Sequence, residues 1–205
     1  MLLALAALLN VWSCAKPKAP RPPETADFLF PVSQPGELQP DEARQIDKAW
    51  RDLMAGEVPD AEKTLQKLAG RRPDLVQAQT GLAYARLKIG KLPEAAVGFA
   101  RALAIRPEYV PALVGAGVTA QRQQDAAMAL AFFRRALAVQ PNDAGLRKRV
   151  AEAKIQITER RVAEAHAALE AGDTARAEER YRQALEAAPE VAGVRLQLAD
   201  LLEGA

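Results

Sequence analysis

Residues 76–109 read VQAQTGLAYARLKIGKLPEAAVGFARALAIRPEY and predict two amphipathic helices joined by a tight turn. Gly90 ends the first helix, because glycine takes the left-handed backbone of a helix end at little steric cost. Pro93 falls in the first turn of the second helix, where a backbone N–H has no partner anyway. Phe99 and Ala102 follow at helical spacing on one face. Such a hairpin cannot bury its apolar side alone, so it requires similar neighbours.

The same unit recurs along the chain with a period of 34 residues. Pro73, Pro107 and Pro141 stand 34 residues apart, and Pro189 follows after 48, which is one period and 14 further residues. Five other kinds of position move with these prolines. They are a small residue in the first helix (Ala49, Ala83, Gly117, Ala165), a helix breaker (Gly56, Gly90, Gln124, Gly172), a small residue that opens the second helix (Ala61, Ala95, Ala129, Ala177), a bulky residue (Leu65, Phe99, Phe133, Tyr181) and a last residue (Leu68, Ala102, Ala136, Ala184).

This helix–turn–helix period resembles the tetratricopeptide repeat family over roughly residues 42–205. The resemblance implies an all-α fold, a right-handed superhelical solenoid of helix–turn–helix repeats in a domain at 41–205. Its parts are repeats at about 42–75, 76–109, 110–143 and 158–191, an inserted helical segment at 144–157 and a capping helix at 192–203.

The 14 additional residues contain no glycine–proline turn, so they predict one continuous helix of about 28 residues from Ala144 to Ala171. At 1.5 Å per residue it is about 42 Å long. Ile155, Val162 and Leu169 fall seven residues apart on it and predict one buried seam. Its six basic residues, which include Arg149, are interspersed with glutamates and indicate a solvated face rather than a nucleic-acid site.

The N-terminus has the pattern of a targeting signal. Residues 2–9, LLALAALL, form an apolar run that is too short to span a bilayer and has the length of a signal-peptide core, which predicts a signal peptide at 1–13. The following Val-Trp-Ser-Cys resembles a bacterial lipoprotein processing site, which implies lipidation of Cys14. Ala15 after it favours the outer membrane, by analogy with enteric lipoproteins. An uncleaved signal, or a cysteine placed there by chance, is the alternative.

A proline-rich segment is expected to link Cys14 to the repeats. Seven of the fourteen prolines lie within residues 17–40, so residues 14–40 are expected to form an extended, semi-rigid tether. Residues 27–32 form an apolar island, DFLFPV, inside it. Two interpretations remain open: a strap that lies against the first repeat, or a docking segment for another protein or for the chain's own groove.

Composition limits the possible chemistry. The formal net charge is +2, so no global charge excess favours nucleic acid. One cysteine and one histidine provide neither an intrachain disulfide nor a Cys/His metal cage, and no phosphate loop, metalloprotease or serine-nucleophile motif occurs. His166 is expected to be a partly buried helix residue. The sequence therefore predicts a protein that is not an enzyme and binds no cofactor, metal or nucleic acid.

The resemblance also implies where a partner protein binds. In the family, the second, fifth, ninth and twelfth places of each repeat face a concave groove. These places hold Ala43, Ile46, Trp50 and Leu53 in the first repeat, Gln77, Thr80, Tyr84 and Leu87 in the second, and Pro111, Val114, Val118 and Gln121 in the third. Chaperone-binding members carry Lys and Asn where this chain has Ile46 and Trp50, so their carboxylate clamp is absent.

A mostly apolar groove suits an extended apolar peptide or an amphipathic helix, with Trp50 and Tyr84 as anchors. The alternative is that Trp50 and Leu53 pack on the tail or between repeats. The favoured hypothesis is a non-enzymatic adaptor, lipid-anchored on the periplasmic side of the bacterial envelope, that docks a peptide or helix of another envelope protein. The second hypothesis is a regulatory subunit of an envelope hydrolase or protease, and an enzyme in its own right is the third.

Overall fold

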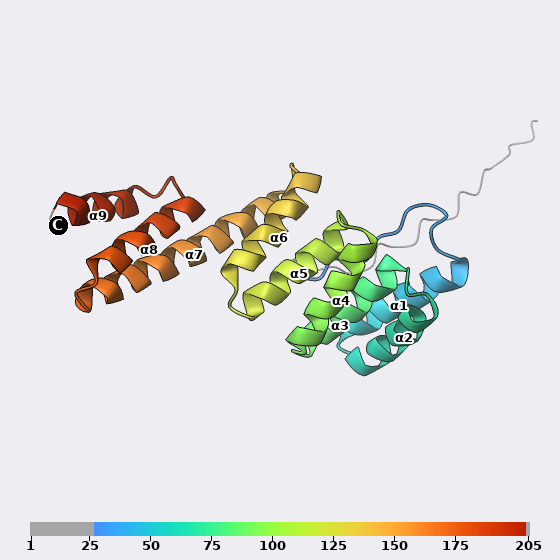
Figure 1. Ribbon diagram of the computed structural model, residues 1–205. Coiled ribbons are helices and arrows are strands. Elements are labelled where there is room, and N and C mark those ends of the chain that lie inside the picture. The colour runs from blue at the N-terminus through green and yellow to red at the C-terminus, as the bar shows by residue number, and fades with distance from the viewer. Residues whose placement is uncertain (1–26, 204–205) are drawn as a thin grey trace, which may run out of the picture.

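The computed structural model describes residues 27–203, and the regular elements of this range are α-helices (Figure 1). The described part of the chain is therefore all-α, with nine helices that pack mainly on their neighbours in sequence. They are α1 (Pro40–Ala55), α2 (Val58–Arg71), α3 (Val76–Lys88), α4 (Leu92–Ile105), α5 (Val110–Arg122), α6 (Ala126–Val139), α7 (Ala144–Glu170), α8 (Thr174–Ala187) and α9 (Ala192–Glu203).

The predicted helix breakers form the turns between paired helices. Gly56, Gly90 and Gly172 have φ of 94°, 77° and 76°, and Gln124, the non-glycine member of the set, has φ of 62°. After the third and fourth turns, Asp125 and Asp173 cap the next helix, because their carboxylates accept the backbone N–H of the third residue beyond. The sequence thus builds four hairpins, α1–α2, α3–α4, α5–α6 and α7–α8.

Small residues on the first helices make room for rings on the second. A Cβ on Gly117 would lie 2.4 Å from the Phe133 ring, and one on Gly115 would lie 2.2 Å from the Phe99 ring. Both rings are fully buried, as are Ala83 and Ala95 at other repeated positions. Close packing of neighbouring hairpins therefore follows from the small and bulky positions of the repeat.

Helix α7 is the predicted long helix, and it joins two separate apolar cores. The first core extends from Phe28 to Ile157, and the second contains Ala165, Ala168, Ala177, Tyr181, Ala184 and Val194. Helix α6 packs on the N-terminal half of α7 and α8 on its C-terminal half (Figure 1).

The predicted seam on α7 is wrong. Ile155 is 54% exposed and Leu169 is also exposed, while Val162 is only partly buried. The buried apolar residues are instead Leu146, Ala153 and Ile157 in the first core, and Ala165 and Ala168 in the second. The predicted row lies on another side of the helix from the buried positions, because α6 and α8 determine which side of α7 is covered.

The segment before α1 lies against the repeats. Residues 27–38, which we call the strap, contact α1, α3, α7 and the link between α4 and α5. This part of the predicted tether is therefore packed on the protein. The predicted signal peptide, Cys14 and the rest of the tether lie outside the described residues.

Candidate partner-binding groove

The predicted groove residues come together on the first helices of three hairpins. Of the twelve predicted residues ten are buried, Gln121 is half-buried and Ala43 is exposed. Trp50 lies on α1, Tyr84 on α3 and Val114 on α5. We call the face formed by these three helices the groove. The strap covers the part of it around Trp50 and Tyr84.

Aromatic side chains connect the strap to the interior of the repeats. The Phe28 ring lies 5.4 Å from that of Tyr84, and the Phe30 ring lies 5.8 Å from that of Trp50, centroid to centroid. Trp50 and Tyr84 are themselves 5.4 Å apart and nearly perpendicular. Edge-to-face pairs at this separation are favourable beyond the area that they bury. The Trp50–Tyr84 pair therefore forms the floor on which both strap rings rest.

Tyr84 is fixed from the side of the helices. Its hydroxyl donates a buried hydrogen bond to the Pro111 carbonyl at 2.7 Å, and its ring packs edge-on against Phe99 at 5.0 Å. The ammonium of Lys88, one turn further along α3, lies 5.2 Å from the centre of the Phe28 ring. The floor is thus held by the repeats, and one cation faces an aromatic ring of the strap.

The C-terminal end of the strap is held by polar groups on the link between α4 and α5. The Tyr109 hydroxyl donates to the Val32 carbonyl at 2.6 Å, and Arg106 pairs with Glu37. Burial raises the pKa of Tyr109 well above its ordinary value, so the phenol stays protonated and remains a donor. Burial also tends to raise the pKa of Glu37, but hydrogen bonds from Gln34 and Arg106 outweigh it and the pKa lies below 4.5.

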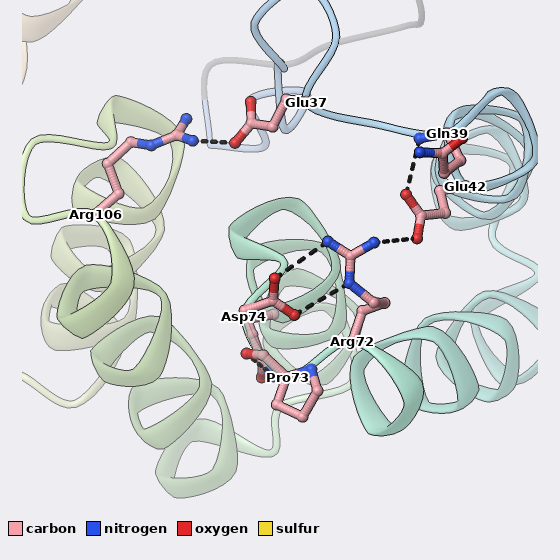
Figure 2. A network of polar contacts seen from close by, with 8 residues as sticks. Glu37, Gln39, Glu42, Arg72, Pro73, Asp74 and Arg106 are labelled. Carbon is pink, nitrogen blue, oxygen red and sulfur yellow. Dashed lines mark hydrogen bonds and ion pairs between the residues drawn. The ribbon is translucent and has the colours of Figure 1, made fainter.

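A polar network continues from this end of the strap to the start of α1 (Figure 2). The Gln39 N–H donates to Glu42 at 2.9 Å, and Arg72 donates to the other oxygen of Glu42 at 2.7 Å. Arg72 also pairs with Asp74 through two hydrogen bonds of 3.1 Å. Beside this network, Figure 2 shows Glu37 reaching Arg106 from the strap. The junction between strap and α1 is therefore attached to the first two hairpins.

The N-terminal end of the strap is held by α7. Arg149 donates to Asp27 at 2.7 Å, and its guanidinium lies 5.3 Å from the centre of the Phe133 ring. The Arg149 side chain is only 11% exposed. The expectation of a fully solvated basic face on this helix is wrong at Arg149, because the strap supplies a carboxylate there that the local charge pattern does not reveal.

Two buried polar side chains on the groove lack hydrogen bonds. The Thr80 hydroxyl and both atoms of the Gln77 amide have no hydrogen-bond partner among the described residues, although both side chains are fully buried. Gln77 is near enough to Glu37 to contribute to its lowered pKa, but it does not reach hydrogen-bond geometry. Each unpaired buried polar group costs about 1–3 kcal/mol in stability. The groove covered by the strap therefore contains polar groups whose hydrogen bonds are not made.

Trp50 packs on Phe30 of the N-terminal segment, which is the alternative stated for it, and Leu53 is fully buried; a partner-binding role of the predicted groove residues stays a prediction. Sequence reasoning found the apolar island but missed the groups that hold the strap. Lys88, Arg106, Tyr109 and Arg149 lie outside the four groove places of their repeats. The only signal for them in the sequence was the acidic and aromatic character of residues 27–30. It indicated that basic side chains elsewhere in the chain could pair with this segment. Of the two open interpretations, the structure shows the form in which the segment lies in the chain's own groove, on Trp50 of the first repeat and Tyr84 of the second.

Other chemistry is sparse in the described part of the chain. Residues 27–203 contain no group of three or more His, Cys, Asp or Glu side chains that could hold a metal ion. Within the same range no helix combines the length and apolar character needed to cross a membrane. His166 is exposed rather than partly buried, and its ring meets that of Tyr181 edge-on at 6.1 Å.

Comparison with known proteins gives a family match and structural likeness. The model of the tetratricopeptide repeat family matches residues 46–111 and 162–205, which is more than half of the chain. No curated protein sequence matches.

Two solved structures illustrate the likeness. The "MamA RS-1 ArsTM double mutant" has a TM-score of 0.51 at 17% identity, over 78% of this chain and 82% of that one. TTC0263, a thermophilic TPR protein of Thermus thermophilus, has a TM-score of 0.49 at 22% identity, over 77% of this chain and 81% of that one. At these identities the likeness concerns the fold alone.

Proposed function

The chain belongs to the tetratricopeptide repeat family, and from that premise we propose that it is a non-enzymatic scaffold that binds a segment of another protein in its groove. Stacked helical hairpins expose extended surfaces suited to protein partners. The observation that carries the proposal is the strap itself. A non-helical segment with two aromatic anchors lies across α1 and α3, so this face accommodates a chain of that kind.

The same proposal includes a location. We propose that Cys14 is lipidated and anchors the protein in the bacterial envelope, at the periplasmic face of the outer membrane, where the partner is another envelope protein. The apolar run at 2–9 and the Val-Trp-Ser-Cys sequence support this. Replacing Cys14 by Ser should abolish incorporation of a labelled fatty acid and release the protein from the membrane fraction. Unchanged labelling would exclude Cys14 as the anchor.

Site-specific photo-crosslinking tests the groove. Glu108 is exposed and lines a cavity next to the strap, whereas Glu94 is exposed on α4, a second helix. A photo-crosslinking amino acid at Glu108 of the full chain should capture a defined partner in intact envelopes, and the same group at Glu94 should not. Capture from Glu94 alone would move the binding surface to the second helices, and capture from neither position would contradict a scaffold role.

A further inference from the structure

We propose that the groove recognises partner segments with the strap's own chemistry, an acidic residue followed by two aromatic residues at alternate positions and then proline, and that the strap competes with them from within the chain. This inference rests on the proposed function, because it names the class of partner for the same groove. The strap is the bound ligand from which that class is inferred.

The spacing of the two phenylalanines fits the floor of the groove. In an extended chain, residues two apart lie on the same side, about 6–7 Å from each other. Phe28 and Phe30 both face the floor, since their rings contact those of Tyr84 and Trp50, which are 5.4 Å apart. A partner with aromatic residues at adjacent positions, or three apart, would place only one ring on this floor.

Three cations around the strap define the charge of the ligand. Arg149 pairs with Asp27, Lys88 lies over the Phe28 ring, and Arg106 pairs with Glu37. Arg149 is the most buried of the three, with 11% of its side chain exposed, and a cation in that position favours a carboxylate. The groove therefore selects an acidic group just before the first aromatic residue.

Proline suits the position after the second aromatic residue. Pro31 is buried, and it carries no N–H that would lack a partner against an apolar surface. The following carbonyl, that of Val32, accepts the Tyr109 hydrogen bond at 2.6 Å. That contact is to the main chain, so any residue can follow the proline.

The strap is attached in a way that allows exchange. The Tyr109 hydroxyl hydrogen-bonds the strap backbone at Val32, and residues 32–36 are exposed. The strap leaves Thr80 and Gln77 without hydrogen bonds, and a cavity of about 500 Å³ remains beside Phe30, Val32 and Tyr109. A partner that fills this cavity, or that pairs Thr80 or Gln77, would gain contacts that the strap does not make.

Covalent attachment gives the strap an advantage in this competition. It joins α1 directly, so its effective concentration at the groove is in the millimolar range or above. The apparent affinity of a partner is reduced by the small fraction of molecules whose strap is detached. Weakening the strap should therefore strengthen binding of a segment added in trans.

The test measures binding of a fluorescent peptide with the sequence of residues 27–38, DFLFPVSQPGEL, by anisotropy. In the full chain, Phe28→Ala combined with Phe30→Ala removes the anchors of the strap and leaves every groove residue intact. This variant should bind the peptide at least tenfold more tightly than the unchanged chain. Val32→Ala, which alters an exposed side chain of the same strap, is the matched control and should bind like the unchanged chain.

The peptide itself provides the specificity control. A peptide with both phenylalanines replaced by alanine should not bind the double variant, and one with Asp27→Lys should bind at least fivefold more weakly. Circular dichroism confirms that the variant keeps its helices. A folded double variant that does not bind the original peptide would overturn the proposal.

A second preparation covers the case in which the double variant does not fold. A protease site placed in the exposed turn at 33–36 of the otherwise unchanged full chain allows the strap to be cut after folding. The cut protein should take up the labelled peptide, and the uncut protein should not; no uptake after cutting contradicts the proposal.

If the peptide binds but Glu108 captures no partner, the proposed function fails and the ligand chemistry stands. If a partner is captured but the peptide does not bind, the proposed function stands and the inferred ligand chemistry fails.

Discussion

At the scale of single residues, the hairpin turns show what each repeat requires. Four turns use a residue in the left-handed region, and Gln124 is the one of these that is not glycine. A side chain in this conformation crowds its own backbone, which costs about 1–2 kcal/mol. Glycine avoids this clash, and its cost is mainly the conformational entropy that it loses on folding. The third turn is therefore the strained member of the set.

This predicts that Gln124→Gly raises the free energy of unfolding by about 0.5–1 kcal/mol. The reciprocal variant, Gly90→Gln, should lower it by about 1 kcal/mol, because Gly90 has the same conformation with φ of 77°. Urea denaturation followed by circular dichroism measures both. A destabilised Gln124→Gly variant would mean that the glutamine side chain contributes a contact that outweighs the strain.

Gly115 and Gly117, inside α5, have a different role, which is to let rings approach. Gly117→Ala should destabilise the protein by about 1–3 kcal/mol, because its Cβ would lie 2.4 Å from the buried Phe133 ring. Gly70→Ala is the matched control: nothing lies within 4 Å of its Cβ, so it should stabilise α2 by about 0.5 kcal/mol. Thermal melts of the two variants should shift in opposite directions, and equal shifts would contradict the packing described above.

At the scale of elements, the 14 additional residues lengthen α7 without breaking it. Fourteen residues advance a helix by about 21 Å and turn it to within about 40° of four complete turns. The C-terminal hairpin is therefore displaced along α7 while the helix presents nearly the same face. This displacement separates the small core around Tyr181 from the larger core that contains Phe133.

Hydrogen exchange should show the two cores opening separately. Tyr181→Ala removes the largest buried side chain of the second core, at a cost of about 3–5 kcal/mol, so exchange should accelerate in α8 and α9 and stay unchanged in α3–α5. Phe133→Ala is the counterpart in the first core and should accelerate exchange in α5 and α6. A uniform loss of protection in either variant would show a single cooperative unit.

Periodicity predicted the helices well because each is specified by local residues. The breakers at Gly56, Gly90, Gln124 and Gly172 and the prolines after each hairpin place the helix ends within a few residues. The exposure of Ile155 and Leu169 was not predictable in this way. It depends on which neighbours α7 meets along its length, and that is a property of the assembled array.

At the scale of the whole molecule, contacts distant in sequence determine the state of the groove. The places of Trp50 and Tyr84 in the repeat predicted that they face a groove, and packing of Trp50 on the N-terminal segment, which the structure shows, was the open alternative. Its pairing of Asp27 with Arg149 spans 122 residues, and its pairing of Glu37 with Arg106 spans 69. No local pattern encodes such partners, because they depend on the curvature of the assembled hairpins.

Acid should loosen the strap. The pKa of Glu37 is lowered in the folded protein, so its contribution is present above its unfolded value near 4.5 and is lost as the pH falls through the lower folded value. In a Trp12→Phe chain, where Trp50 is the only tryptophan, Trp50 emission should change as the pH falls below 4.5. Glu37→Gln should remove this component, and an identical titration in that variant would exclude Glu37 as its source.

The strap also has a mechanical consequence. It enters α1 at Pro40, and its distal end is the Asp27–Arg149 contact. A pulling force applied at the N-terminal side of Asp27 would load these contacts one after another, first Arg149, then Tyr84 and Trp50, and last Tyr109 and Arg106. Sequential rupture needs far less force than breaking the same contacts together in shear. A molecule held by its N-terminal segment would therefore uncover its groove under modest tension while its helices stay folded.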